Sequence, residues 1–483
     1  MGNILGDLAN ATKALNAHRF GVTTAGTNIA NVNNPEYARQ KAILGDRGTI
    51  QGLNGPQGLG VEVVGFAQMR DTVLDREVLR ETSINSSLTA QHDALSKAEA
   101  NMGQEINRTG DSAFIDGVAN DGSGAGGLAG VLNDFFNAFH SLSANPGSDA
   151  EKESLLQKSE MLIQKLNVTS TRFADLKDDL SSVVETDLED VNRLLGEVAR
   201  LNSEIARAEA SHAGQALTLR DQRQARLADL SEYMQVDVNN IKNSGGQVSV
   251  SVSTINGPLK LIEEGRFEQI NFDDSVPGLP QFTIEGSGEQ ILVKGGSMHG
   301  ALIARDGGIQ DYIGSLDRLA SELVTQLNGL YNGGAAPGNT NFFTDSGNAA
   351  QKTAAGISLD ATLSTISLRT TNDVAQEQGD NSVILAIAEL DSAEFTNLGE
   401  RSFSSFYRAT VSELAQDVAT VESRLEDEGI VFNLLKEQQD AVSGVSIDEE
   451  MTDMMKFQRA FEATAKHIKA IDEMLDVIIN RLI

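Results

Sequence analysis

The stretch that decides the fold lies at residues 447–482 and reads IDEEMTDMMKFQRAFEATAKHIKAIDEMLDVIINRL. One row of residues recurs every seven positions in it, at Ile447, Met454, Phe461, Ile468, Leu475 and Leu482. A second row of the same spacing runs beside it, at Phe457, Thr464, Ile471 and Ile478. Spacings of seven place residues on one face of an α-helix and are typical of a coiled-coil seam.

A second stripe occupies the other end of the chain, in steps of four and three, at Ile4, Leu8, Ala11, Leu15, His18, Val22, Ala25 and Ile29. A terminal helix has little neighbouring sequence to cover an apolar stripe, so each stripe implies a partner. Residues 1–44 hold four basic and two acidic residues, whereas residues 440–483 hold five basic and nine acidic ones. We therefore expect the two helices to pair, with a weak contribution from these exposed charges.

The composition of the chain excludes several classes of function. At 483 residues it is long enough for two to four domains. Its net charge of −31 argues against binding to nucleic acid or to anionic lipid. The absence of cysteine excludes disulfides, thiolate catalysis and cysteine zinc sites. The first twenty residues lack the apolar core of a secretory signal, and no stretch is long and apolar enough for a membrane span.

Hydrophobic periodicity predicts a mainly α protein with an inserted β domain. We expect helices over residues 4–30, 70–106, 128–233 with a break at 145–147, 309–330 and 403–482. Short strands are expected near residues 61–66, 248–252, 259–262, 267–272, 281–284 and 290–293, with further strand-like pieces over 341–371. The predicted architecture is an elongated multi-domain molecule with an N- and C-terminal coiled coil, a helical-bundle middle domain and an outer antiparallel β domain.

The expected domain boundaries follow the same pattern. Residues 1–45 and 440–483 form the terminal core. Residues 46–235 and 391–439, with the helix 309–330, form the middle domain. Residues 236–308 and 331–390 form the outer β-rich domain.

No catalytic, cofactor or metal site is predicted. The six histidines are scattered, and none is spaced with another as a helical metal pair. Residues 122–127 formally fit GxGxxG but lack a good preceding strand, so we interpret them as a connector. The acid pairs Asp178–Asp179 and Glu449–Glu450 are interpreted as parts of solvated helix faces.

Several motifs carry a resemblance to a known family. The segment NIANVNNPEYARQ at residues 28–40 closely resembles the signature after the first helix of bacterial flagellar axial proteins, the rod, hook and hook-associated proteins. Glu36 stands where many members have glycine. Five further segments resemble the hook-associated members: GVEV at 60–63 with RD at 70–71, FFNAFHSLSANP at 135–146, LRDQR at 219–223, GSMHGALIARD at 296–306, and SGVSIDEE at 443–450 with FQ at 457–458 and DEM at 472–474.

The resemblance implies a non-enzymatic structural protein at the junction of the flagellar hook and filament, secreted by the flagellar type III export route without a cleaved signal peptide. Its implied partners are copies of itself in a ring, the hook protein, a second junction protein and an export chaperone at the C-terminal helix. We expect the terminal helices to fold on assembly or on chaperone binding. The alternatives are another axial protein, of the second-junction, hook or distal-rod type, or an adhesin carried by the outer domain.

The stripes and the motif after the first helix together give the expected assembly interface, which has no cofactor. Its predicted residues are Ile4, Leu8, Ala11, Leu15, Val22, Asn28, Ile29, Asn31, Asn33, Pro35, Tyr37, Arg39, Ile447, Met454, Phe457, Phe461, Ile468, Ile471, Leu475, Ile478 and Leu482.

Overall fold

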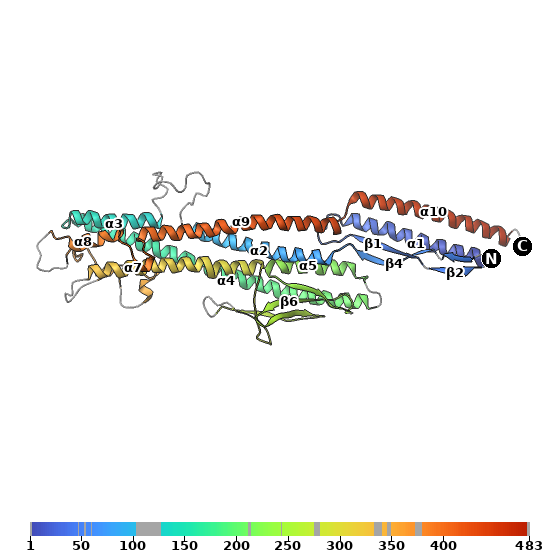
Figure 1. Ribbon diagram of the computed structural model, residues 1–483, viewed down its shortest axis with the longest axis horizontal. Coiled ribbons are helices and arrows are strands. Elements are labelled where there is room, and N and C mark those ends of the chain that lie inside the picture. The colour runs from blue at the N-terminus through green and yellow to red at the C-terminus, as the bar shows by residue number, and fades with distance from the viewer. Residues whose placement is uncertain are drawn as a thin grey trace. The chain divides into compact units, whose positions relative to one another are not determined.

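The structure is a computed structural model that describes residues 2–46, 48–52, 55–58, 60–102, 127–210, 214–242, 244–274, 281–332, 341–344, 349–371 and 379–480. The chain forms two compact units, one from residues 1–86, 187–296 and 427–483, the other from residues 87–186 and 297–426. The predicted fold class, mainly helical with an inserted antiparallel β part, is confirmed (Figure 1). The GxGxxG segment falls almost wholly outside the described residues.

The first unit contains both terminal helices, α1 (Gly2–Ala30) and α10 (Ile447–Asn480). It also contains α5 (Leu217–Tyr233). Three longer helices, α2 (Thr72–Asn101), α4 (Asp149–Glu209) and α9 (Phe403–Ser443), each contribute residues to both units. Between α1 and α2 the chain is extended: β1 (Gln40–Asp46) pairs antiparallel with β4 (Val61–Gln68), and β2 (Thr49–Gly52) pairs with β3 (Gly55–Gly58).

The inserted β part is a seven-stranded antiparallel sheet in the first unit. The strand order is β8 (Arg266–Phe267), β7 (Gly257–Glu263), β6 (Val248–Thr254), β11 (Gln290–Ile291), β10 (Gln281–Ile284), β9 (Ile270–Asp273), and β5 (Asp237–Asn240) also pairs with β6. The alternating residues Val248, Val250 and Val252 are at most 3% exposed. This alternation is why β6 was predictable, since residues two apart lie on one face of a strand.

Two asparagines of α4 attach the sheet to the helix. The Asn202 side chain donates to the Val248 carbonyl at 2.8 Å and accepts from the Val248 amide at 3.2 Å. Asn192 makes the same two bonds with Ile270, each at 2.9 Å. A side-chain amide that satisfies both polar groups of one residue fixes the position of that strand.

The second unit is helical around an aromatic core. It contains α3 (Leu128–Ala144), α6 (Gly296–Ala304), a π-helical turn (Arg305–Ile309), α7 (Gln310–Tyr331) and α8 (Ser382–Ala388), with Gly296 itself assigned to the first unit. Phe135 lies at the centre of this core, with its ring 5.1 Å from those of Phe136 and Phe139. The other fully buried rings around it are Tyr331, Phe342, Phe343 and Phe403.

The short strands expected over residues 341–371 do not form in the described part of that segment. Only an isolated bridge joins Phe343 and Leu359. The Asp360 carboxylate instead accepts from the Thr362 amide at 2.9 Å, and the Ser367 hydroxyl accepts from the Ser364 amide at 2.8 Å. Side chains that satisfy nearby backbone groups compete with strand pairing, so turns result.

Candidate assembly interface at the terminal helices

The two terminal helices pack against each other within the first unit (Figure 1). They lie close together at Gly21, where an added Cβ would lie 2.6 Å from atoms of the Phe457 ring. Cβ atoms do not approach other atoms so closely, so the phenylalanine occupies the space that a side chain at 21 would need. The His18 ring lies beside the same phenylalanine, with ring centroids 6.4 Å apart. Glycine at 21 therefore makes room for the Phe457 ring against α1.

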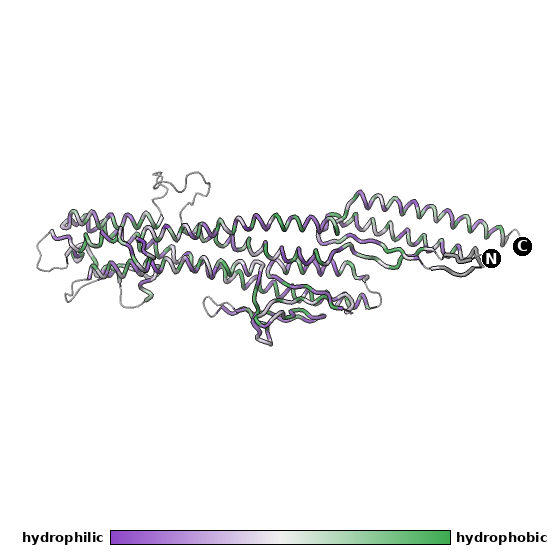
Figure 2. The backbone as a smooth tube through the Cα atoms, viewed as in Figure 1, coloured by the Kyte–Doolittle hydropathy of each residue, from purple (hydrophilic) through white to green (hydrophobic). Residues whose placement is uncertain are grey.

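The less exposed face of α10 carries the two seven-residue rows. Ile471 is 2% exposed, and the remaining row members from Met454 to Leu475 are half-buried. Apolar positions recur along this helix between polar ones (Figure 2). Ile447 is 46% exposed and does not join the packed face. The side chain of Ile478 and the whole of Leu482 lie outside the described residues.

The buried face of α1 consists of small residues. Ala17, Ala25 and Asn28 are 1%, 3% and 1% exposed, and Ala11 is also buried. The large apolar residues of the predicted stripe, Leu8, Leu15, Val22 and Ile29, are only half-buried, and the side chain of Ile4 is outside the described part. Small side chains let α10 and the β1–β4 pair approach closely. Ala11 and Ala25 belong to the predicted stripe, and Asn28 to the predicted interface. A search for alanine and glycine at helical spacing would have added Ala17 and Gly21, which are also buried.

Asn28 joins three segments at the end of α1. Its amide nitrogen donates to the Gln40 carbonyl and to the Glu450 carboxylate, both at 2.9 Å. Its amide oxygen accepts from the Tyr37 hydroxyl at 2.7 Å and from the Gln40 amide at 3.0 Å. One buried side chain thus connects α1, the following turn with β1, and the first turn of α10.

Arg39 makes the second connection to α10. Its Nε donates to Glu450 at 2.6 Å and its Nη1 to Glu449 at 2.7 Å, while its backbone amide donates to the Ser443 carbonyl at 2.9 Å. Burial by itself would lower the pKa of Arg39, but the Glu450 and Glu449 carboxylates together outweigh burial and hold the pKa above its usual value. The guanidinium therefore stays charged and paired.

The interpretation of Glu449–Glu450 as a solvated pair is wrong for Glu450. The side chain of Glu450 is 4% exposed, against 62% for that of Glu449. Adjacent residues on a helix face different directions, and Glu450 is on the side that meets Asn28 and Arg39. Sequence reasoning missed its role because its partners Asn28 and Arg39 lie 422 and 411 positions away in the chain. Asp178 and Asp179 are exposed, as expected.

Tyr37 occupies the turn between Asn28 and Arg39. Burial and the nearby carboxylates of Asp221 and Glu450 raise its pKa to about 12, because each of them disfavours the phenolate. The neutral hydroxyl is the form that can donate to Asn28. Tyr37 therefore stays protonated well above the usual range of a tyrosine.

The other motif residues shape the turn and do not reach α10. Asn31 donates from its side chain to the Thr27 carbonyl at 2.9 Å, which closes the last turn of α1. Asn33 and Pro35 are exposed, and proline prevents the helix from continuing. Glu36 stands where many family members have glycine, yet it is absent from the residues of positive φ among those described. The turn therefore forms here without left-handed backbone at this position.

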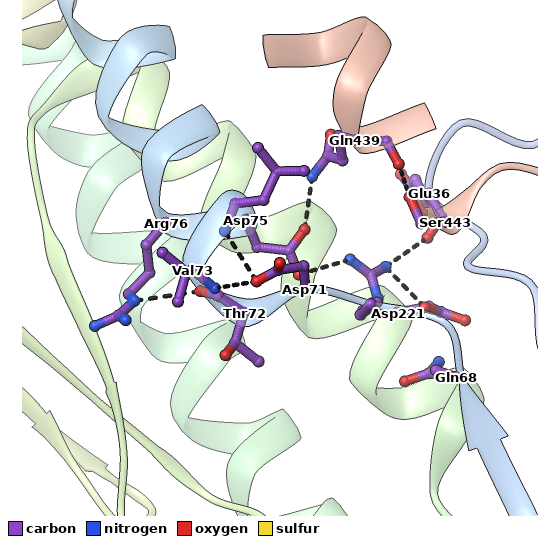
Figure 3. A network of polar contacts seen from close by, with 12 residues as sticks. Glu36, Gln68, Asp71, Thr72, Val73, Asp75, Arg76, Asp221, Gln439 and Ser443 are labelled. Carbon is purple, nitrogen blue, oxygen red and sulfur yellow. Dashed lines mark hydrogen bonds and ion pairs between the residues drawn. The ribbon is translucent and has the colours of Figure 1, made fainter. Parts of the chain in front are cut away.

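A second polar network lies beside the first (Figure 3). Arg70 donates to Asp221 at 2.8 Å, to Asp75 at 3.5 Å and to the Glu36 carbonyl at 3.3 Å. Gln439 of α9 donates to the other oxygen of Asp75 at 2.7 Å. Burial raises the pKa of Asp221 above its usual value, although Arg70 opposes that shift. The network connects the turn after α1 with α2, α5 and α9.

Pairing of α1 with α10 leaves large apolar side chains uncovered on the first unit. At least 39% of the residue surface is exposed at Phe20, Ile43, Leu44, Met69, Ile447, Met451, Met455, Met474 and Val477. Met451 and Met455 are four residues apart on α10 and so lie on the same side of that helix, where exposed apolar side chains can meet a partner.

The described residues contain no group of three or more histidine or acidic side chains placed to hold a metal ion. Within the same part of the chain, no helix has both the length and the apolar character required to cross a bilayer.

Comparison with known proteins supports the resemblance. A model described as "Flagellar hook-associated protein FlgK helical domain" matches residues 113–343, and one described as "Flagellar basal body rod FlgEFG protein C-terminal" matches residues 438–482. The chain is 26% identical to flagellar hook-associated protein 1 of Bacillus subtilis, over 98% of this chain and 97% of that protein. It is 24% identical to the Escherichia coli protein of the same name, over 98% of each.

A solved structure agrees in fold. The flagellar hook junction protein FlgK from Burkholderia pseudomallei superposes with a TM-score of 0.62 at 12% identity, over 76% of this chain and 100% of that one. The two family models and the curated relatives, which agree with the fold, identify a structural protein of the bacterial flagellar axis. Within that class, the chain is similar along nearly its whole length to flagellar hook-associated protein 1.

Proposed function

We propose that this protein is a non-enzymatic structural component of the bacterial flagellum that forms the junction between hook and filament by self-assembly through its terminal helices. The observation that carries the proposal is the incomplete cover of the α1–α10 pair. The two helices contact each other within the chain, at Gly21 with Phe457 and at Asn28 with Glu450. The outer apolar side chains of the pair, such as Met451 and Met455, are about half exposed and are available to neighbouring copies.

The same proposal implies the assembly partners of the protein and its route of export. Copies of this chain form a ring that meets the hook protein on one side and a second junction protein on the other. Before assembly an export chaperone covers α10, whose exposed methionines suit an adaptable apolar contact. The chain leaves the cell through the flagellar export channel without losing a signal peptide. In the ring, residues 1–45 and 440–483 form the core, the helical middle domain surrounds it, and the outer β-rich domain faces outward.

A charge placed in the seam tests this proposal. Phe461→Asp or Leu15→Asp, expressed in a strain that lacks the native protein, should give hooks without filaments while the protein is still exported. Ala470→Asp is the matched control, because it adds the same charge on the exposed face of α10. Electron microscopy of the hooks and immunoblotting of the medium give the readouts. Normal filaments in both seam variants would overturn the role of the seam, and loss of the hooks themselves in the deletion strain would overturn the junction position.

A further inference from the structure

The first unit has a cleft lined by arginines that the assembly interface does not use. Its volume is about 550 Å³, and its walls come from the end of β4, the first turns of α2, α5, and strands β5 and β6. Four guanidinium groups line it, those of Arg70, Arg76, Arg220 and Arg223. In a chain of net charge −31, such a concentration of positive charge is unexpected.

Two of the four arginines are neutralised by carboxylates. Arg70 pairs with Asp221 at 2.8 Å. Arg220 binds Glu209 through two bonds, at 2.8 and 2.7 Å, and Glu209 is buried. The positive charges of Arg70 and Arg220 are therefore neutralised within the chain.

Arg223 has no carboxylate within ion-pair distance among the described residues, although it is only 7% exposed. Its Nη1 donates to the Asn202 side chain at 2.9 Å and to the Gly246 carbonyl at 2.8 Å. Both acceptors are neutral. Burial and repulsion from Arg220 lower its pKa to about 10, although the Glu209 carboxylate opposes that shift. The guanidinium therefore remains charged at neutral pH, and Glu209, the acid that attracts it, is already bound by Arg220.

Arg76 is the second arginine of the cleft that forms no ion pair with a carboxylate among the described residues. It is exposed, and its Nε donates to the Thr72 carbonyl at 3.2 Å, but no acidic side chain in the described part of the chain forms an ion pair with it. Figure 3 shows Arg76 directed away from the network around Asp75 and Asp221. Asp75, the acid that lines the cleft, is already held by Arg70 and Gln439.

From these contacts we infer that the cleft is an oxyanion-binding site, in which Arg223 and Arg76 hold a carboxylate or phosphate group. A guanidinium presents its donors in a planar fork that matches both groups. Gln224, which lines the cleft and is half-buried, offers a neutral donor beside them. The oxyanion has two possible sources, a free small anion or an acidic side chain of a second copy of this chain.

The binding test uses the full-length unassembled chain with inorganic phosphate as the probe, titrated by calorimetry at constant ionic strength. The native chain should bind phosphate saturably, and Arg76→Gln and Arg223→Gln should each weaken binding roughly tenfold or more. Arg200→Gln is the control, because Arg200 is an exposed arginine of the same unit that pairs with Glu204. Arg76 is exposed, so its variant remains informative even if Arg223→Gln fails to fold.

Absence of saturable binding, or equal binding by the native chain and Arg76→Gln, would overturn the inference. A second measurement separates the sources: self-assembly followed by light scattering, with and without saturating phosphate. Inhibition by phosphate, together with weaker assembly of Arg76→Gln, assigns the site to a carboxylate of a second copy. If neither phosphate nor the Arg76→Gln substitution alters assembly, the cleft is assigned to a free anion. Because binding is measured before assembly, its failure leaves the proposed function untouched.

Discussion

Two neighbouring glutamates show how sharply the environment differs between single residues. Glu449 is mostly exposed, whereas Glu450 is buried and receives donors from both Arg39 and Asn28. Removal of one partner from a buried, hydrogen-bonded charge pair leaves the other partners unsatisfied, and this costs more than the loss of an exposed pair.

Glu450→Ala should therefore weaken the junction of α1 with α10 by about 3 kcal/mol, while Glu449→Ala should cost less than about 1 kcal/mol. The measurement is the urea concentration that dissociates the assembled protein. Equal midpoints for the two variants would show that the buried pair does not hold the helices together.

Gly21 gives a steric prediction at the same scale. Gly21→Ala places a methyl group 2.6 Å from the Phe457 ring and should destabilise the assembled state by about 1–3 kcal/mol. Gly6→Ala is the matched control, since an added Cβ there meets nothing within 4 Å and alanine favours a helix by about 1 kcal/mol. The temperature of thermal dissociation should fall for Gly21→Ala and should stay the same or rise for Gly6→Ala. An equal rise in both variants would contradict the close packing at Gly21.

Tyr37 provides a prediction about pH. Its folded pKa of about 12 exceeds the unfolded value near 10, so its contribution to stability is complete below pH 10 and is lost as pH rises through 12. The absorbance titration of the native assembly minus that of Tyr37→Phe should show one phenol with a midpoint near 12. A midpoint near 10 would mean that the tyrosine is not held against Asn28.

At the scale of elements, local periodicity decides how much the sequence predicts. The rows of α10, the core-facing residues of α4 and the alternating valines of β6 repeat over many residues, so their elements were predicted. Strand β5 was missed because Asp237–Asn240 has a single apolar residue and owes its structure to pairing with β6. The buried face of α1 was predicted in part: Ala11 and Ala25 lie in the predicted stripe, but Ala17 and Gly21 were missed because small residues carry little weight in an apolar pattern.

The contacts of Asn28, Arg39 and Glu450 were beyond sequence reasoning for another reason. They join residues far apart in the chain, and a polar pair of this kind leaves no local pattern. The motifs at residues 28–40 and 443–450 marked its two sides through their resemblance to the axial family, but neither indicated that these residues contact each other.

The helices α1 and α10 should differ from α4 in the unassembled chain. Each terminal helix has one packed face, and an isolated helix is only marginally stable in water. Hydrogen exchange on the free chain should therefore be fast over residues 4–29 and 447–480 and slow in the buried middle of α4, with protection of the ends appearing on assembly. Strong protection of both ends in the free chain would contradict this expectation.

At the scale of the whole molecule, net charge governs association. Copies that each carry −31 repel one another at low ionic strength, where the screening length is about 30 Å at 0.01 M salt. Raising salt to 0.15 M shortens that length to about 8 Å and should promote assembly through the apolar surfaces.

Sedimentation at the two salt concentrations measures the effect, with Phe461→Asp as the control that should not assemble at either. If assembly were stronger at low salt, attraction between opposite charges, and not apolar contact, would dominate the interface.

The bond from Asn28 to Glu450 spans 422 positions in the chain, and this separation imposes an order in time. Bringing two such distant residues together costs loop-closure entropy that only the finished contact repays. A chain that emerges from a ribosome, or passes end-first through a narrow channel, has no access to this contact until residue 450 has appeared. The pairing of α1 with α10 is therefore among the last events of maturation. Until then, the N-terminal helix is able to bind a different partner.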